Sequence, residues 1–284
     1  MPELTLETYA QALERVIREG LAEDVGAGDV TTLATVPAEA RATGELRLKA
    51  PGVLAGLDVF AAVFAALDPA VRVEPLAADG DAFDDVPRDV ALVDGPARAL
   101  LSGERLALNL LQRMSGIATA TRRYVEAVEG TGVAILDTRK TVPGLRLLDK
   151  RAVAAGGGTN HRMGLHDAIL IKDNHIAIAG GIAAAVELAR AGAPGLAVEV
   201  EARTEQEVAD SVNAGADVIL LDNMDVPGLR HAVALVDGRA TTEASGGITL
   251  DTIRAVAETG VDRISVGALT HSVTALDLSL ELRT

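Results

Sequence analysis

The chain has 284 residues, and its 41 acidic residues outnumber its 26 lysines and arginines, which gives a formal net charge of −15. Such an acidic surface repels phosphate backbones and anionic lipid, which argues against nucleic-acid or membrane-surface binding as the main activity. A hydrophobic fraction of 49% describes a globular chain with a large core, and the lack of cysteine excludes disulfides, a thiolate nucleophile and a cysteine-based zinc site.

No targeting segment is evident in the sequence. The first fifteen residues lack the basic segment followed by an apolar run that marks a secretory signal. The longest apolar stretch, residues 52–67, is interrupted by Asp58 and is too short to span a bilayer. We therefore expect a cytoplasmic enzyme or binding protein.

The first hundred residues predict an α+β domain. Apolar residues at helical spacing predict an amphipathic helix over residues 5–20, residues 44–48 alternate like a half-buried strand, and residues 59–67 predict a short apolar helix. Pro96 then opens a long helix. Its leucines are too dense for one solvated face, so we expect this helix to be buried between domains or subunits.

After residue 130 the sequence repeats a unit of a short apolar strand, a polar strand end and a helix. The expected strands are residues 133–137, 168–172, 197–201, 218–222, 241–245 and 263–267. One intervening helix opens with a Thr204/Glu207 capping box and closes at Gly215, and another is expected over residues 249–260. Near-continuous apolar strands joined by helices specify a parallel sheet covered on both faces.

Six such units are too few for a full eight-stranded barrel. The fold class is therefore α/β: an N-terminal α+β sandwich domain followed by an incomplete parallel α/β barrel of about six to seven strands. We expect the first domain at residues 1–108, with residues 271–284 packing back on it, and the catalytic barrel at residues 109–270.

Polar residues close the expected strands. They are Asp137, Lys172, Glu201, Asp222 and Ser245, and Gly267 closes the last strand. In a parallel barrel these strand ends share the rim on which active sites are built. A single polar strand end would simply mark a loop, but charged residues on four strands favour one catalytic face.

A basic segment lies between Thr138 and His175. It holds seven Arg and Lys, three His and three acids, so it is net +4 inside a chain of −15. A ligand with two anionic groups would explain it, because Arg offers a bidentate fork to a carboxylate and Lys a point charge to a phosphate. The favoured residues are Arg139, Lys140 and Lys172 at strand ends, and His161 and Arg162 after a glycine run. A solvated helix face is the preferred interpretation for Arg146, Lys150 and Arg151, and salt bridges between domains are a further alternative.

Two glycine turns follow the last two strands. Ser245-Gly246-Gly247 and Val266-Gly267-Ala268 each lie between a strand and a helix, where backbone amides and a helix N-terminus form a phosphate site. One such turn is weak evidence, because tight strand-helix turns need glycine anyway. Two of them match the position of phosphate sites in barrel enzymes.

Glu201 and Asp222 end the strands of two neighbouring strand-helix repeats. Such a pair can hold a sugar diol, bind Mg²⁺ through water or stabilise an oxocarbenium cation. Two buried structural acids are the alternative. His161, His166 and His175 lack the HExxH spacing, so they are better interpreted as ligand-contacting or structural than as a zinc site.

Several motifs together resemble the quinolinate phosphoribosyltransferase family, the carboxylating nicotinate-nucleotide pyrophosphorylases. They are residues 104–121 (ERLALNLLQRMSGIATAT), 137–146 (DTRKTVPGLR), 156–174 (GGGTNHRMGLHDAILIKDN), 198–201 (VEVE), 220–223 (LLDN), 244–247 (ASGG) and 266–272 (VGALTHS). The resemblance covers nearly the whole chain and implies a type II phosphoribosyltransferase-like fold. Asp149 and Arg151 stand where the family's LEKYA pattern has Glu and Tyr. The change to Asp149 is conservative, and the change to Arg151 is expected at the surface.

The resemblance implies a reaction and a set of binding residues. Quinolinate and phosphoribosyl pyrophosphate would give nicotinate mononucleotide, pyrophosphate and CO₂, with Mg²⁺, in NAD synthesis. By resemblance, Arg105, Arg139, His161, Arg162 and Lys172 clamp the two ring carboxylates, with Arg105 supplied by the second subunit of a homodimer or of a hexamer of dimers. Lys140, Lys172 and His271 meet phosphates, Glu201 and Asp222 the ribose, and residues 245–247 and 266–268 the 5′-phosphate; Thr138 belongs to the same substrate-binding set.

The implied catalytic residues are Lys140, Glu201 and Asp222. Lys140 and Mg²⁺ stabilise the leaving pyrophosphate, the two carboxylates support the cationic ribose, and the ring nitrogen attacks C1′. Three alternatives stay open at this point. They are a paralogue of the molybdenum-operon type acting on another anionic acceptor, a non-catalytic sensor of phosphorylated ligands, and a Schiff-base lyase using Lys172.

Overall fold

The computed structural model describes residues 7–283 and divides the chain into two compact units. Unit 1 comprises residues 1–120, 141–157 and 272–284, and unit 2 comprises residues 121–140 and 158–271. The boundary expected after residue 108 falls inside helix α4 (Ala97–Ala127), which continues from one unit into the other without a break. Residues 141–157, expected in the barrel, belong to unit 1.

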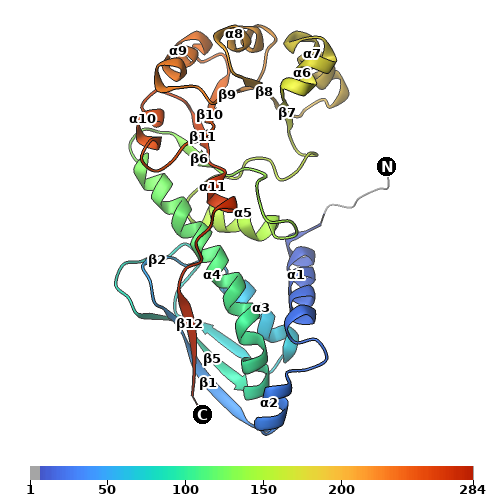
Figure 1. The fold of residues 1–284 in the computed structure, drawn as a ribbon, viewed down its shortest axis with the longest axis vertical. Helices are drawn as coiled ribbons and strands as arrows, with labels where there is room; N and C mark the ends of the chain where they lie inside the picture. The colour runs from blue at the N-terminus through green and yellow to red at the C-terminus, as the bar shows by residue number, and fades with distance from the viewer. Residues whose placement is uncertain (1–6, 284) are drawn as a thin grey trace. The chain divides into compact units, whose positions relative to one another are not determined.

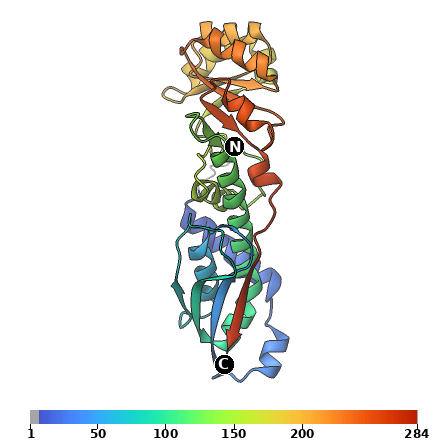
Figure 2. The same cartoon turned by 90° about the vertical axis from the view of Figure 1, so that its left-hand side faces the viewer.

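Unit 1 is built around an antiparallel sheet. Its elements are α1 (Tyr9–Asp24), α2 (Val30–Thr35), β1 (Arg41–Leu48), β2 (Gly52–Val53), α3 (Leu57–Leu67), β3 (Arg72–Pro75), β4 (Ala82–Phe83), β5 (Arg88–Pro96), the first part of α4, α5 (Arg146–Ala155) and β12 (Leu278–Arg283). The sheet order is β12-β1-β5-β3, and β2 pairs with β4. Figure 2 shows how the C-terminal strand lies beside strands from the first hundred residues, as the expected return of the C-terminus requires.

The core of unit 1 lies between this sheet and its helices. Strand β1 alternates between buried and accessible residues, with Leu46 and Leu48 fully buried. Helix α3 contributes Phe60 and Phe64, whose rings meet edge to face at 5.1 Å between centroids. Most of the leucines in α4 are buried as expected, although Leu101 is 40% exposed.

Helix α1 begins later than the sequence predicted. Its N-cap is Thr8, which forms a reciprocal capping box with Gln11, so the helix starts at Tyr9. The predicted start at residues 5 and 6 lies outside the described part of the chain.

Helix α5 explains why residues 141–157 join unit 1. Asp149 is fully buried and accepts two hydrogen bonds from Arg113 of α4, at 2.8 and 2.7 Å. Lys150 is also buried, at 1% exposure, so the expected solvated face is wrong at this position. Arg151 binds Asp58 and lies over the Tyr9 ring. The expected surface change at Arg151 is therefore a contact between α5, α1 and α3.

Unit 2 holds the parallel sheet. Its elements are the end of α4, β6 (Ala134–Leu136), β7 (Ile169–Ile171), α6 (Asp173–Ala179), α7 (Ile182–Gly192), β8 (Val198–Ala202), α8 (Glu205–Asn213), β9 (Val218–Asp222), α9 (Val226–Val236), β10 (Thr241–Ser245), α10 (Ile253–Ala257), β11 (Arg263–Ser265) and α11 (Ala268–His271). All six expected strands are present within two residues of their predicted bounds. Figure 1 shows helices α7 to α10 along the outer side of the curved sheet.

The sheet forms an open barrel. The strand order is β6-β11-β10-β9-β8-β7, so β6 and β7 are edges that do not pair with each other. Beyond β6, Thr159 forms a single parallel bridge to Leu136, in the position of a seventh strand. An incomplete barrel of six to seven strands is confirmed.

The connecting helices follow the predicted caps with one exception. Helix α8 opens with the expected Thr204/Glu207 capping box, with the hydrogen bond from Glu207 N to Thr204 Oγ1 at 3.2 Å. Helix α10 is limited to Ile253–Ala257, although a helix over residues 249–260 was expected. Turns formed by residues 250–252 and 258–260 occupy its expected ends.

Within residues 7–283, no single helix combines the length and apolar composition needed to cross a membrane. Helices α6 and α7 meet that requirement only when they are taken together, and they are bent by 91° at their junction.

Candidate active site

A cleft of about 290 Å³ opens at the carboxyl ends of the parallel strands. It is lined by Thr138, Arg139, Lys140, His161, Arg162, Leu170, Lys172, Glu201, Arg203, Leu220, Asp222, Glu243, Ser245 and Ser265. All of these residues belong to unit 2. The cleft therefore brings together nine of the residues that the sequence singled out, because parallel strands end at one shared rim.

Glu201 and Asp222 are held by cations. Lys172 Nζ pairs with Glu201 Oε2, and Arg203 reaches Glu201 Oε1 at 2.9 Å and Asp222 Oδ2 at 3.3 Å. Arg203 also contacts Asp173 at 3.2 Å. The carboxylate pair is thus oriented by two cations at the mouth of the cleft.

Arg203 was missed by the sequence analysis, which ended the strand at Glu201. Strand β8 runs on to Ala202, and alternation along a strand places Glu199, Glu201 and Arg203 on one face. The alternation of charges in VEVEAR is the signal that could have identified it.

Arg139 and Arg162 form a positive patch in the cleft. Burial, and after it the charge of Arg139, lower the pKa of the Arg162 guanidinium from its usual value. Arg162 Nη1 donates to the Ala168 carbonyl at 3.2 Å, which holds the side chain in place. Two neighbouring guanidinium groups that repel each other favour an anion between or beside them.

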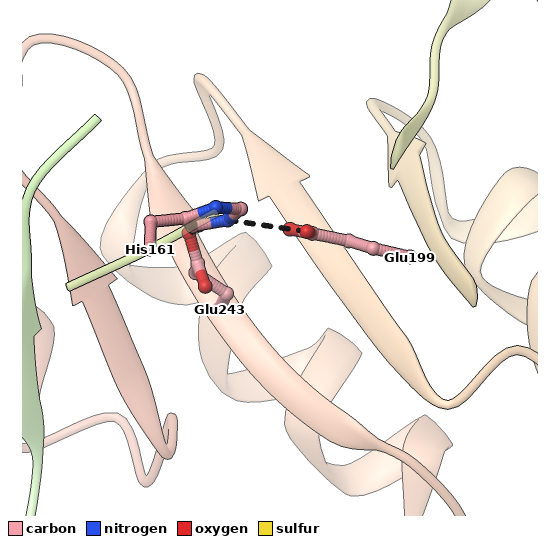
Figure 3. A group of neighbouring side chains, drawn as sticks. All are labelled: His161, Glu199 and Glu243. Atoms are coloured by element: carbon pink, nitrogen blue, oxygen red, sulfur yellow. Dashed lines mark ion pairs between the residues drawn. The ribbon is translucent and has the colours of Figure 1, made fainter. Parts of the chain in front are cut away.

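His161 lines the cleft and lies against two buried acids. Figure 3 shows its ring beside Glu199 of β8 and Glu243 of β10. The distances from His161 Nε2 are 3.1 Å to Glu199 Oε2 and 3.5 Å to Glu243 Oε1. Burial, and after it the Glu199 carboxylate, raise the pKa of Glu243 to about 7. Both acids were missed, although a Glu inside each apolar strand was visible in the sequence.

The three histidines considered for zinc do not gather in one place. His175 Nδ1 accepts a hydrogen bond from the Lys172 backbone at 2.9 Å, away from the acids around His161. In the described part of the chain, the group with donor atoms close enough for a metal ion is His161, Glu199 and Glu243, all within 4.8 Å of one another.

The first glycine turn follows β10. Gly246 and Gly247 both have positive φ, at 102° and 61°. A Cβ on Gly246 would lie 2.2 Å from Asn223 Oδ1, so only glycine fits there. The helix N-terminus expected behind this turn is absent, because α10 begins only at Ile253. Any anion here would meet loop amides rather than a helix end.

The second glycine turn brings two predicted phosphate-binding residues together. A Cβ on Gly267 would lie 3.0 Å from Lys140 Cδ and 3.3 Å from His271 Nε2. Thr270 Oγ1 donates to the Lys140 carbonyl at 2.8 Å, which ties the segment after β6 to helix α11. This helix has only four residues, so it too contributes little dipole.

Arg105, the acceptor-binding residue expected from the second subunit, is exposed. It lies on α4 in unit 1, and its side chain is 61% exposed.

Comparison with known proteins identifies the family. The model of the quinolinate phosphoribosyl transferase C-terminal domain matches residues 117–281, and that of the N-terminal domain matches residues 29–115. The chain belongs to the quinolinate phosphoribosyltransferase family. The family expected from the sequence motifs is thereby confirmed.

Individual members of the quinolinate phosphoribosyltransferase family resemble the chain over nearly its whole length. A probable nicotinate-nucleotide pyrophosphorylase [carboxylating] from Bacillus subtilis is 45% identical over 271 residues, which cover 95% of this chain and 93% of that protein. Among solved structures, NadC from Streptococcus pyogenes has a TM-score of 0.93 at 40% identity, covering 98% and 99% of the two chains. The nicotinate-nucleotide pyrophosphorylase from Francisella tularensis has a TM-score of 0.94 at 38% identity, covering 99% and 100%.

Proposed function

We propose that this chain transfers the phosphoribosyl group of phosphoribosyl pyrophosphate to the ring nitrogen of quinolinate, releasing pyrophosphate and CO₂ and forming nicotinate mononucleotide. The observation that carries the proposal is the division of one cleft into a dicationic side, Arg139 and Arg162, and a carboxylate side, Glu201 and Asp222. An acceptor dicarboxylate and a ribose cation need these opposite charges at neighbouring positions. Family membership supports the same reaction.

The acceptor is held by its charges. Arg139 and Arg162 bind the two ring carboxylates, and the approach of a dianion relieves the repulsion between the two guanidinium groups. Thr138 also lines the cleft. Fixing both carboxylates directs the ring nitrogen at C1′ of the ribose.

The donor ribose meets the carboxylate side. As the bond to pyrophosphate breaks, positive charge grows on the ribose ring, and Glu201 and Asp222 stabilise it. Lys172 and Arg203 hold these carboxylates in place beforehand. The attacking nitrogen carries no proton, so no general base is needed. After the transfer, the C–CO₂ bond at C2 breaks, the positively charged ring nitrogen stabilises the carbanion that CO₂ leaves behind, and C2 then takes up a proton from solvent.

Lys140 and His271 bind the phosphates beside Gly267, and residues 245–247 and 266–268 enclose the 5′-phosphate. Mg²⁺ fits this arrangement as an ion carried by the substrate pyrophosphate. Both Glu201 oxygens are already paired with cations, so Glu201 would hold the ion through water, and Asp222 would do the same. When bound, Mg²⁺ supplies charge neutralisation to the pyrophosphate.

An assay with quinolinate, phosphoribosyl pyrophosphate and Mg²⁺ tests the proposal directly. We expect nicotinate mononucleotide and CO₂ in equal amounts. Formation of neither product would reject this function and favour a paralogue acting on another anionic acceptor. Binding of both substrates without turnover would favour a sensor, and trapping of Lys172 by borohydride would favour a lyase.

Two variants test the roles of the acceptor side and the ribose side of the cleft independently. Arg139→Ala should raise the KM for quinolinate at least tenfold, as expected for a lost charged hydrogen bond. Glu201→Ala should lower kcat by a similar factor while quinolinate affinity, measured by calorimetry, is largely kept. The reverse pattern would show that the roles are wrongly assigned.

The assembly is proposed to be a homodimer, or a hexamer of dimers, in which Arg105 reaches the partner's cleft. The exposed side chain of Arg105 supports this proposal. Arg105→Ala and Lys140→Ala subunits, each inactive alone, should regain about one quarter of wild-type activity after mixing and reassortment, since one site of each mixed dimer is intact. No recovery, despite mixed dimers seen by mass spectrometry, would contradict the shared site.

A cytoplasmic location also stays a proposal, and fractionation of cells that express the protein would test it.

A further inference from the structure

The interior of the open barrel contains two buried acids where parallel barrels usually place branched apolar residues. Glu199 and Glu243 are 5% and 1% exposed, and they come from alternate strands, β8 and β10. Burying two carboxylates in one place is costly unless they hold a partner. The partner they share is the ring of His161 (Figure 3).

The hydrogen bonds of His161 define its tautomer. Nδ1 accepts from the backbone N–H of Arg162 at 2.7 Å, so Nδ1 carries no proton. Nε2 therefore carries the proton and donates it to Glu199 Oε2 at 3.1 Å, while Glu243 Oε1 lies 3.5 Å from the same nitrogen without accepting that proton. The backbone N–H of His161 donates to the buried Asp137 at 2.9 Å.

These bonds place the His161 ring between the buried acids and the backbone of Arg162. His161 also lines the cleft, and its expected contact with a ring carboxylate stays a prediction. Arg162 itself lines the cleft.

We propose that Glu199 and Glu243 are positioning residues of the acceptor site: Glu199 accepts the Nε2 proton of His161, Glu243 packs beside the same nitrogen, and together they fix the backbone from which Arg162 reaches the substrate. This role rests on the proposed function. The acids act at a distance from the reacting atoms, so their loss affects capture of the acceptor and leaves the donor side, Lys140 and Asp222, unchanged. Glu199 has the greater effect because its oxygen is nearer to Nε2.

Kinetics with matched variants test the role. Glu199→Ala should raise the KM for quinolinate about tenfold and Glu243→Ala less, with the KM for phosphoribosyl pyrophosphate unchanged. Glu199→Gln keeps an acceptor oxygen of the same shape, so it should restore the quinolinate KM to within about threefold. Glu187→Gln, on the exposed side of α7, is the control for a lost charge. An equal rise in both KM values, or no rescue by Gln, overturns the proposal.

Nitrogen NMR of histidine-labelled protein provides a test that does not depend on the reaction. Wild-type His161, assigned by its loss in His161→Gln, should show the neutral tautomer protonated at Nε2, and Glu199→Ala should convert it to a mixture of tautomers. An imidazolium in the free protein, or a signal that Glu199→Ala leaves unchanged, overturns the proposal. If quinolinate is not a substrate at all, the proposed function fails while this measurement still decides the positioning role.

A metal ion on the same three side chains is the competing outcome. Titration of the protein with Zn²⁺ or Mn²⁺ should show no site that is lost in Glu243→Gln. Stoichiometric binding that disappears in this variant would overturn the proposal, because a metal on Nε2 would replace the proton that Glu199 accepts.

Discussion

Replacing Glu243 with Gln should change how the stability of the protein depends on pH. Burial, and after it Glu199, raise the pKa of this carboxyl from 4.5 to about 7, while His161 acts in the opposite direction. The folded protein therefore binds more protons than the unfolded chain between these two values. The free energy of unfolding consequently falls as pH rises through that window, and the loss is complete above about pH 7.

The magnitude follows from the two pKa values. At about 1.4 kcal/mol per pKa unit, a rise from 4.5 to about 7 corresponds to roughly 3 kcal/mol. Gln has the same shape and does not ionise. The free energy of unfolding of Glu243→Gln, relative to wild type, should therefore increase by about 2 to 3 kcal/mol between pH 5 and pH 8.

Urea denaturation at several pH values measures this difference, with a probe in unit 2 so that unfolding of the barrel is followed. The exposed Glu187→Gln variant should keep the wild-type pH dependence. If Glu243→Gln also kept it, the carboxyl would be ionised in the folded protein at the same pH as in the unfolded chain. The account of two buried acids around one histidine would then be refuted.

Arg113→Ala should lower the free energy of unfolding of unit 1 by about 3 to 5 kcal/mol, because it leaves the buried Asp149 carboxylate without its bidentate partner; a loss below about 1 kcal/mol in urea denaturation would contradict this. Gly246→Ala should raise the KM for phosphoribosyl pyrophosphate at least tenfold, because the new methyl group meets Asn223. Gly247→Ala has a similar positive φ but no neighbour within 4 Å, so it is the matched control. Equal effects of the two changes on KM would show that backbone strain, and not the collision, is responsible.

The order of the strands along the chain and their polar ends could be predicted because a parallel strand buried on both faces has a simple signature. A short strand-like run that ends in a polar residue or glycine recurs six times after residue 130, and each occurrence became a strand of the open barrel. Lys172, Glu201 and Asp222 were placed at one rim by this reasoning alone. The N-cap of α8 could be predicted as well, because it depends on hydrogen bonds between residues that are close in the sequence.

Other features depended on contacts between distant residues. Residues 141–157 follow a barrel strand, yet their buried Asp149 pairs with Arg113 of α4 and so joins them to unit 1. The α10 helix is shorter than its apolar spacing suggested, which removed the expected helix end from the first glycine turn. Neither outcome can be derived from local propensity.

The sequence by itself determined which residues reach the rim of the barrel, because strand periodicity and the direction of parallel strands settle that without any long-range information. Only the tertiary structure decided which of those residues pair with one another. Lys172 and Arg203 gather around Glu201 because the paired strands β7 and β8 end side by side. Glu199 and Glu243 enclose His161 because curvature of the open sheet brings the alternate strands β8 and β10 close enough for their side chains to meet. The spacing of residues along the chain does not show which side chains come close together in the fold, so it cannot predict these ion pairs and hydrogen bonds.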